Sequence, residues 1–243
     1  MSKAVEKSMK DERLKTDLIT NVSHDIKTPL TSIINYVDLL KRENIQDPKI
    51  QGYLDILEAK AQRLKHLTED VVEASKISSG NITMEYMNIN FVEMINQTTG
   101  EFAEKFEKRN LQIVLNVPEK PVMVRTDGRR MWRVIENIYN NAAKYALEGT
   151  RVYADLIEKE HTVEFSLKNI SEQPLNISAD ELTERFIRGD VSRSTEGSGL
   201  GLSIAKNLTE LQGGKFELYL DGDLFKVTIV FPKAVVGQSV TKS

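Results

Sequence analysis

The stretch KFELYLDGDLFKVTIVFP at residues 215–232 sets the fold class of the second half of this chain. On either side of Asp221-Gly222 every second residue is apolar, in the order Phe216, Leu218, Leu220, then Phe225, Val227, Ile229 and Phe231. Such alternation is typical of strands that bury one face, and Asp-Gly is a common pair in tight hairpin turns. The stretch therefore predicts two antiparallel strands that lie on a core.

The segments before this hairpin extend the pattern. Apolar residues alternate again between 152 and 156 and between 163 and 167, and shorter strands are expected at Leu111–Val117 and Val122–Val124. Phe91–Lys108 and Arg129–Ala146 show helical spacing instead. Helices combined with antiparallel strands predict an α+β fold for this half, namely an α/β sandwich with a mixed, largely antiparallel sheet and helices on one face.

The first half of the chain is expected to be helical. Between Asp11 and Lys76, apolar residues recur in steps of three, four and seven, which marks one face of a helix. Asn44–Pro48 interrupts the pattern, with Asp47-Pro48 suited to a helix start, and Ser78–Asn81 ends it. Because a helical hairpin alone buries both apolar stripes poorly, a dimeric four-helix bundle is favoured. A monomeric hairpin packed on the second half is the alternative.

Composition excludes several classes of protein. The 243 residues include 33 Lys plus Arg and 36 Asp plus Glu, a net charge of −3, which argues against a nucleic-acid partner. Zero cysteines exclude disulfides, thiolate metal sites and a cysteine nucleophile, and the three histidines are too few to favour a multi-histidine metal site. No apolar run approaches the roughly 20 residues of a membrane helix, so the sequence is expected to be soluble.

The segment SHDIKTPL at residues 23–30 contains a histidine suited to nucleophilic chemistry. His24 falls off the apolar stripe and should face water or a partner. Neutral imidazole is available near pH 7, and the carboxylate of Asp25 can orient the ring and take its proton. Thr28 lies one turn on, and Pro29 should weaken or bend the helix. An idle histidine beside a helix-breaking proline is the alternative, which this segment alone favours.

The helical segment ENIYNNAAKY at residues 136–145 has a polar face. Asn137, Asn141 and Lys144 are spaced i, i+4 and i+7, so their side chains share that face. Amide oxygens can ligate Mg²⁺ or its waters, and a lysine can meet phosphate. A merely solvated polar face is an equally weighted alternative.

Gly197, Gly199 and Gly201 alternate at the start of the helical run Leu200–Leu211. Glycines that lead into a helix expose backbone N–H groups, which can cradle phosphates, although a flexible loop is the alternative. The preceding stretch 171–196 has no clear period, as is typical of lids and disordered segments. It contains the candidate phosphate contacts and lid anchors Arg185, Phe186, Arg188 and Arg193.

Together these segments resemble the transmitter region of sensor histidine kinases of two-component systems, over about residues 10–232. His24–Leu30 matches the phosphoacceptor box of that family, and Asn137–Tyr145 matches its asparagine box. Arg185–Arg188 looks like the phenylalanine box, Gly197–Gly201 matches the glycine box, and Gly213-Gly214 matches a later glycine pair. Each motif alone is weak, whereas their order and spacing make the resemblance strong.

The resemblance implies a domain organisation and a set of partners. Residues 1–80 would form the dimerisation and histidine phosphotransfer domain, 81–88 a linker, 89–232 a catalytic domain with a Bergerat-type ATP-binding fold, and 233–243 a tail. A second copy of the chain and the receiver domain of a response regulator would be the partners. The chain would be the cytoplasmic domain of an inner- or plasma-membrane protein whose membrane segment lies upstream.

The resemblance also assigns roles to single residues. Asp25 would be the base for His24, and Thr28 would position water when the protein dephosphorylates its partner. In the ATP site, Asn141 would ligate Mg²⁺ and Tyr145 would lie near the adenine. Asn137 and Lys144 would contact phosphates, and Arg188 would approach the γ-phosphate. The phosphates would be framed by Gly197, Gly199 and Gly201.

One departure from the family concerns the adenine end of the site. The family has an Asp-x-Gly-x-Gly segment whose aspartate receives the adenine amino group, whereas Asn169 stands there in this chain and the glycines are missing. An asparagine oxygen can still accept that bond, without the charge-assisted part worth about 1 kcal/mol. The sequence therefore predicts ATP binding that is retained but weaker.

The expected function is that of an ATP-dependent protein histidine kinase, which autophosphorylates His24, passes the phosphoryl group to an aspartate of a response regulator and dephosphorylates that regulator. A phosphatase-biased pseudokinase scaffold with weak nucleotide binding is the first alternative, motivated by Asn169. A hydrolytic ATPase of the gyrase type is the second. Asn137 speaks against it, because an asparagine cannot replace the glutamate base found near that position in gyrase-like enzymes.

Overall fold

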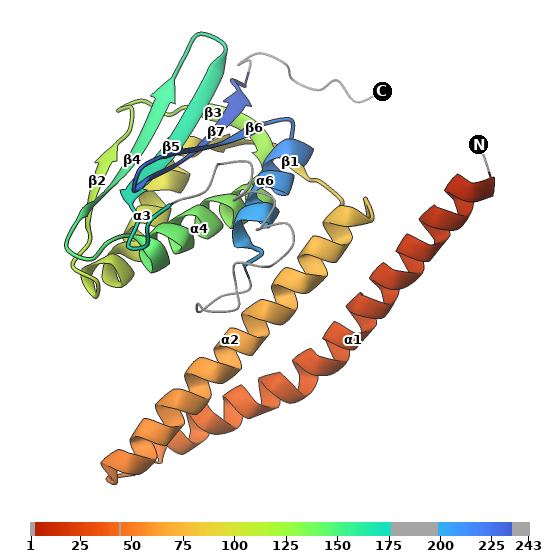
Figure 1. Cartoon of the computed structure of the whole chain (residues 1–243), viewed down its shortest axis with the longest axis vertical. Coiled ribbons are helices and arrows are strands. Elements are labelled where there is room, and N and C mark those ends of the chain that lie inside the picture. The colour runs from red at the N-terminus through yellow and green to blue at the C-terminus, as the bar shows by residue number, and fades with distance from the viewer. Residues whose placement is uncertain (1–2, 44, 176–198, 235–243) are drawn as a thin grey trace. The chain divides into compact units, whose positions relative to one another are not determined.

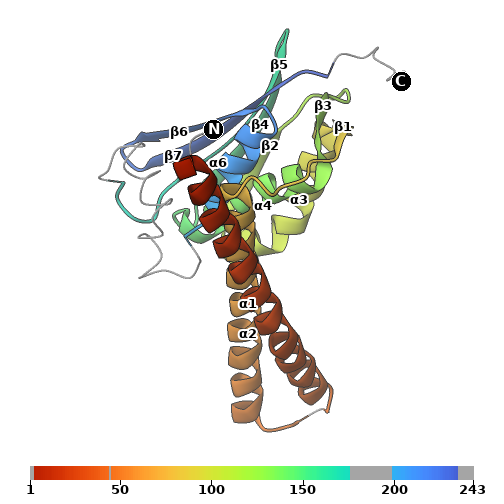
Figure 2. The same cartoon turned by 90° about the vertical axis from the view of Figure 1, so that its right-hand side faces the viewer.

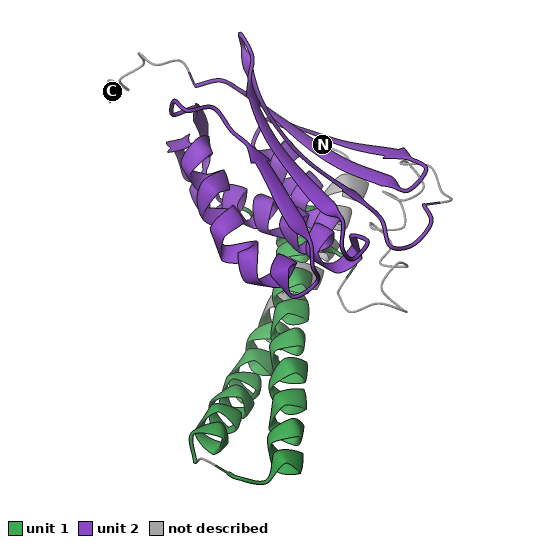
Figure 3. Ribbon diagram, turned by 90° about the vertical axis from the view of Figure 1, so that its left-hand side faces the viewer, with its two compact units in different colours: residues 1–82, 191–200 green, residues 83–190, 201–243 purple. Residues whose placement is uncertain are grey.

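A computed structural model describes residues 3–43, 45–175 and 199–234 of the chain. The chain divides into two compact units, one of residues 1–82 and 191–200 and the other of residues 83–190 and 201–243 (Figure 3). Within the described residues, every helix falls short of the combined length and apolar character that a bilayer crossing requires.

The first unit contains a hairpin of two long helices, α1 (Lys3–Arg42) and α2 (Pro48–Ser78), as the spacing of apolar residues predicts (Figure 1). Asp47 is the N-cap of α2, and its Oδ1 accepts hydrogen bonds from the backbone N–H of Lys49 at 2.8 Å and of Ile50 at 3.4 Å. Pro48 costs this helix no hydrogen bond, because the first N–H groups of a helix have no partner within it.

The apolar stripe of the hairpin divides into a buried part and an exposed part. Leu30 and Val37 of α1 and Leu54 and Ala61 of α2 are buried. Many other apolar side chains of the two helices are exposed, among them Val22, Ile33, Tyr36, Leu39, Leu40, Tyr53, Ile56, Leu57, Leu64 and Val71. The hairpin therefore buries only part of the apolar surface of its two helices.

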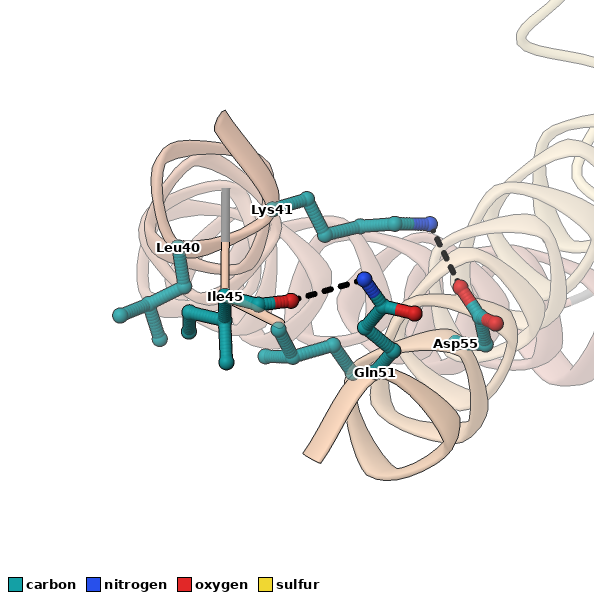
Figure 4. A pocket seen from close by; sticks show the side chains of 6 residues that line it. Leu40, Lys41, Ile45, Gln51 and Asp55 are labelled. Carbon is teal, nitrogen blue, oxygen red and sulfur yellow. Dashed lines mark hydrogen bonds and ion pairs between the residues drawn. The ribbon is translucent and has the colours of Figure 1, made fainter. Parts of the chain in front are cut away.

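The loop end of the hairpin is fixed by polar contacts around a small pocket (Figure 4). The Nζ atom of Lys41 lies 2.8 Å from Asp55 Oδ1 and 2.7 Å from Glu58 Oε2, and these two carboxylates raise the pKa of Lys41. Gln51 Nε2 donates to the backbone oxygen of Ile45 at 2.7 Å. Leu40 and Leu54 complete the lining of this pocket. These contacts hold the end of α1 against the start of α2.

The second unit is built on a five-stranded sheet with the order β2-β4-β5-β7-β6. The strands are β2 (Gln112–Asn116), β4 (Arg151–Glu158), β5 (Thr162–Ile170), β7 (Leu224–Pro232) and β6 (Lys215–Asp221). Strands β2 and β4 are parallel and all other pairs are antiparallel, so the expected mixed, largely antiparallel sheet is confirmed. Asp221 pairs with Leu224, which leaves Gly222, at φ 55°, and Asp223 in the predicted hairpin turn.

A second, two-stranded sheet was not predicted. Strand β1 (Tyr86–Asn90) pairs antiparallel with β3 (Met123–Asp127). The first three residues of β1 lie in the segment 81–88 that was expected as a linker.

The helices α3 (Phe91–Glu107), α4 (Gly128–Tyr145) and α6 (Gly201–Leu211) lie on one side of the five-stranded sheet (Figures 1 and 2). The ring of Tyr139 in α4 stacks on Phe165 of β5 at a centroid distance of 6.2 Å, and both rings are fully buried. Burial raises the pKa of Tyr139 to about 12, and its hydroxyl pairs with Thr99 Oγ1 at 2.8 Å. This contact fixes which face of α4 points away from the core.

The start of α4 is held by a buried polar network. Asp127 is the N-cap, and its carboxylate accepts from the backbone N–H of Arg130 at 3.1 Å and of Glu85 at 2.8 Å. Burial alone would raise the pKa of Asp127, but these backbone donors outweigh it and lower that pKa. Gln212, which follows α6, accepts from Asp127 N at 3.0 Å and from Thr126 Oγ1. Helices α4 and α6 are therefore tied together at this end.

We expect Gly214→Ala to destabilise the second unit, because a Cβ there would lie 2.6 Å from Cε1 and Cζ of the buried Phe231 ring. Overpacking of this kind costs about 1–3 kcal/mol. Gly100→Ala is the matched control: a Cβ at this α3 position meets nothing within 4 Å, and the change should stabilise by about 0.5–1 kcal/mol. Urea unfolding followed by fluorescence of the one tryptophan, Trp132 in α4, measures both effects. Equal midpoints for Gly214→Ala and the unchanged protein would contradict the contact.

Candidate functional site

The predicted nucleophile lies on an exposed surface of α1. The side chain of His24 is 81% exposed and that of Asp25 is 85% exposed. His24 Nδ1 lies 3.9 Å from Asp25 Oδ1, which is too long for a hydrogen bond but close enough for a small rotation to make one. The predicted position of His24 outside the interior of the hairpin is therefore confirmed.

The turn that follows His24 has altered backbone hydrogen bonding. Pro29 lies inside α1 and cannot donate to the backbone oxygen of Asp25, four residues earlier. The Thr28 hydroxyl donates to the His24 oxygen at 3.4 Å, and the Thr31 hydroxyl donates to the Lys27 oxygen at 2.8 Å. The helix continues to Arg42 despite this loss. A weak point at Pro29 stays a prediction.

The polar face of α4 descends from the interior toward solvent. Asn137 is buried, Asn141 is half-buried and Lys144 is exposed, as expected for residues spaced along one face of the helix. Glu136 is turned away from this face by about 100° and its carboxylate pairs with Arg133 Nη1 at 2.9 Å. The carboxylate of Glu136 is therefore directed to Arg133 and not to the amides of Asn137 and Asn141.

The last glycine of the segment, Gly201, lies against the asparagine face of α4. Gly201 is the first residue of α6, and a Cβ at this position would lie 3.3 Å from Asn137 Oδ1. Gly199 has a φ of 69°, a conformation in which a side chain would be strained. Glycine at 201 thus allows α6 to begin against the Asn137 side chain.

Asn169 lies near the end of β5, and its side chain is almost fully buried. Its Nδ2 donates to the backbone oxygen of Ile170 at 3.1 Å, so its orientation is fixed. The other side-chain atom, Oδ1, has no hydrogen-bond partner.

Two buried side-chain atoms in the described part of the chain lack a hydrogen-bond partner, and both belong to predicted site residues. One is Nδ2 of Asn137, a donor, and the other is Oδ1 of Asn169, an acceptor. An unpaired buried polar group costs about 1–3 kcal/mol, so native proteins retain few of them without a function. A donor and an acceptor left open in one unit fit a ligand that is both a hydrogen-bond acceptor and a donor.

Some predicted residues lie outside the described residues, namely Arg185, Phe186, Arg188, Arg193 and Gly197. Conversely, Arg109 has contacts at the site that the sequence did not point to. Its guanidinium binds the last turn of α4, which bears Lys144 and Tyr145. A lone arginine after a helix carries no pattern, so only the tertiary structure could identify it.

Two family models match this chain. The His Kinase A (phospho-acceptor) domain matches residues 14–80, which include His24. The model described as Histidine kinase-, DNA gyrase B-, and HSP90-like ATPase matches residues 126–235, which include Asn137, Asn169 and Gly201.

Curated relatives match nearly the whole chain. The sensor protein VanSC of Enterococcus gallinarum is 31% identical over 243 residues, which cover 96% of this chain and 67% of VanSC. The sensor histidine kinase GacS of Pseudomonas protegens is 28% identical over 95% of this chain and 26% of GacS. The chain thus spans about two thirds of one relative and about a quarter of the other.

Solved structures show the same fold. Full-length ShkA in complex with AMPPNP aligns with a TM-score of 0.74 at 19% identity and covers 92% of this chain and 47% of ShkA. ThkA in complex with the response regulator protein TrrA aligns with a TM-score of 0.62 at 23% identity and covers 96% of this chain and 66% of that chain.

Proposed function

This chain belongs to the sensor histidine kinases of two-component systems, and from that membership we propose that it phosphorylates its own His24 with ATP and passes the phosphoryl group to an aspartate of a response regulator. The observation that carries the proposal is the pair of unpaired buried amide atoms on Asn137 and Asn169, because an adenine nucleotide would satisfy both. The exposed His24 in the first unit provides the acceptor.

In the proposed binding mode, the adenine amino group donates to Asn169 Oδ1, and the ring lies near Tyr145. Asn137 Nδ2 donates to a phosphate oxygen, and Lys144 supplies positive charge farther out on the same helix face. The start of α6 at Gly201, adjacent to Asn137, adds backbone N–H groups and the positive end of a helix dipole. ShkA, which shares this fold, was solved in complex with AMPPNP.

The donor set also fits Mg²⁺. This ion takes oxygen ligands and usually keeps phosphate and water oxygens beside one or two protein ligands. The half-buried Asn141, one turn from Asn137, can supply an amide oxygen. Mg²⁺ held there with the triphosphate would neutralise phosphate charge.

In the proposed reaction Nε2 of His24 is the nitrogen that attacks, with Asp25 beside the other ring nitrogen. Nδ1 is the ring nitrogen nearest Asp25, so a proton held on Nδ1 leaves the lone pair of Nε2 free. Nε2 forms a bond to the γ-phosphorus while the bond from that phosphorus to the β–γ bridging oxygen breaks, and ADP leaves. Asp25 accepts the Nδ1 proton as the ring becomes cationic. The proposed roles of Arg188 in charge balance and of Thr28 in dephosphorylation complete this scheme.

Two partners follow from the surface of the hairpin. The exposed apolar side chains of α1 and α2 fit a second copy of the chain in a four-helix bundle. The exposed His24 fits a receiver domain that brings its aspartate to the phosphorylated ring, and ThkA was solved with such a regulator.

Incubation of the purified chain with γ-labelled ATP and Mg²⁺ tests the proposal. Label that is lost in acid and kept in base identifies a nitrogen–phosphorus bond, and its later appearance on an added receiver domain identifies transfer. Steady phosphate release with no protein-bound label would instead indicate a hydrolytic ATPase. Nucleotide binding without label, together with dephosphorylation of a phosphorylated receiver, would indicate the phosphatase-biased scaffold that the Asn169 departure suggests.

The adenine end can be tested separately with Asn169→Ala. Loss of the acceptor should weaken ADP binding about tenfold, because a hydrogen bond of this kind contributes about 1–1.5 kcal/mol. Asn116→Ala is the matched control: its Nδ2 donates to Asp155 Oδ1 at 2.6 Å, and it is an exposed amide of the same unit. Calorimetric titration with ADP-Mg²⁺ measures both. Equal affinities for the two variants would rule out the Asn169 contact.

A further inference from the structure

Arg109 links two parts of the nucleotide site that lie far apart in the sequence. It lies in the turn between α3 and β2, and its side chain is 25% exposed. Nη1 donates to the backbone oxygens of Ala143 at 3.0 Å and Lys144 at 2.5 Å. Nη2 lies 2.9 Å from Glu172 Oε2. One guanidinium thus joins the last turn of α4 to the segment that follows β5.

This contact completes the hydrogen bonding at the C-terminal end of α4. The last four carbonyls of a helix have no partner within it. Here the Ala142 oxygen accepts from Ala146 N at 3.0 Å, and the Tyr145 oxygen accepts from Glu172 N at 2.8 Å. Arg109 serves the two carbonyls between them and places a positive charge at the negative end of the helix dipole.

The residues held in this way are those of the proposed site. The last turn of α4 bears Lys144 and Tyr145, and Glu172 lies three residues after Asn169. Leu147 N donates to the Ile170 oxygen at 2.8 Å, which adds a backbone tie between the same two segments. These bonds therefore help to set the relative position of the phosphate end and the adenine end of the site.

We propose that Arg109 and Glu172 form a clamp that positions the last turn of α4 against Asn169 for nucleotide binding. Arg109 is a positioning residue in this proposal and does not touch the nucleotide. The proposal rests on the proposed function, because it assigns the clamp to that same ATP site.

The expected effect is on affinity rather than on chemistry. Without Arg109, two carbonyls lose their partners and the last turn can fray, so a nucleotide must order this turn when it binds. Arg109→Ala should raise the Kd for ADP-Mg²⁺ about tenfold and KM for ATP by a similar factor. The kcat at saturating ATP should change less than about twofold, because loss of ground-state and transition-state binding alike leaves kcat unchanged.

Three variants and one control test the clamp. Arg109→Lys keeps one charge near the carbonyls without the planar fork, so it should restore part of the affinity that Arg109→Ala loses. Glu172→Gln leaves the carbonyl contacts and weakens only the ion pair, so a rise in Kd of about threefold is expected. Arg129→Ala is the control, since its guanidinium pairs with Glu85 at 3.0 Å near the opposite end of α4. It should leave Kd and KM unchanged.

Circular dichroism establishes that each variant is folded at the temperature of the titration. If Arg109→Ala does not fold, the Glu172→Gln and Arg109→Lys titrations decide the question. Unchanged Kd in these folded variants, or a fall in kcat with KM unchanged, would overturn the clamp while leaving the proposed function intact. Failure of the unchanged protein to bind ADP-Mg²⁺ at millimolar concentration would instead overturn the proposed function itself.

Discussion

His24→Gln is expected to abolish acid-labile phosphorylation of the chain, a loss of at least about 10³-fold, because covalent catalysis fails without its nucleophile. A glutamine has similar bulk, but its amide nitrogen has no free lone pair with which to attack phosphorus. The His24 side chain is 81% exposed, so the change should alter the free energy of unfolding by no more than about 0.5 kcal/mol. Labelled ATP with acid and base treatment measures the effect.

His66→Gln is the matched control for this experiment. His66 is an exposed histidine on α2, the other helix of the same hairpin, and has no assigned role. It should keep full labelling. Nucleotide binding should be unchanged in both variants, because Asn137, Asn141 and Asn169 of the proposed ATP site lie in the other unit. Acid-labile label that persists in His24→Gln would show that another nitrogen accepts the phosphoryl group.

The central strands β4, β5 and β7 of the main sheet could be predicted because each buries one face against the core. In β7, Phe225, Val227 and Ile229 are buried and the residues between them are not, so the alternation is complete. Strand β1 has no such signal. Tyr86 and Met87 are both exposed, and the strand pairs with β3 outside the main sheet. A short strand that buries neither face consistently leaves no period for sequence reasoning to detect.

The helical period identified the apolar stripe of the hairpin, but not which of its residues are buried and which are exposed. Leu30 and Ile33 belong to the same predicted stripe, yet Leu30 is buried against the hairpin and Ile33 is exposed. A period gives the direction of a side chain around one helix, whereas burial depends on which neighbour lies there. The dimer expected from the sequence supplies a neighbour for the exposed part.

The asparagine face of α4 was predictable for the same reason, since one helix fixes the spacing of Asn137, Asn141 and Lys144. The contact between Asn137 and Gly201 was not, because it joins two helices that are far apart in the sequence and meet only in the folded unit. The Arg109 contacts belong to the same class of long-range pairing. Sequence reasoning therefore found the chemical groups, and only the structure shows which of them meet.

The departure at Asn169 is locally consistent in the structure. Its Nδ2 donates to the Ile170 oxygen, which also accepts from Leu147 N. An aspartate in the same position would place a carboxylate oxygen against that carbonyl without a proton between them. Asparagine therefore suits this backbone, and its free Oδ1 keeps the acceptor that the adenine amino group needs.

Gly201→Val should weaken ADP-Mg²⁺ binding about 10–100-fold. The Cβ would lie 3.3 Å from Asn137 Oδ1 and 3.6 Å from Asn137 Cγ, and valine fills two of the three positions around that Cβ. Overpacking costs about 1–3 kcal/mol. If the Asn137 amide moves out of its binding position to relieve the overpacking, this cost appears in the affinity, where each 1.4 kcal/mol corresponds to a tenfold change in Kd. Calorimetric titration measures the affinity, and Gly100→Val, at a position with nothing within 4 Å, is the control.

A double-mutant cycle separates the two consequences of that contact. Asn137→Ala removes the amide, so Gly201→Val should destabilise the second unit much less in the Asn137→Ala background than in the unchanged protein. Nucleotide affinity should nevertheless stay low in the double variant, because the donor Nδ2 of Asn137 is gone. Recovery of stability without recovery of binding would locate the nucleotide at the Asn137 amide. Recovery of both would mean that Gly201 matters only for packing and that the phosphates bind elsewhere.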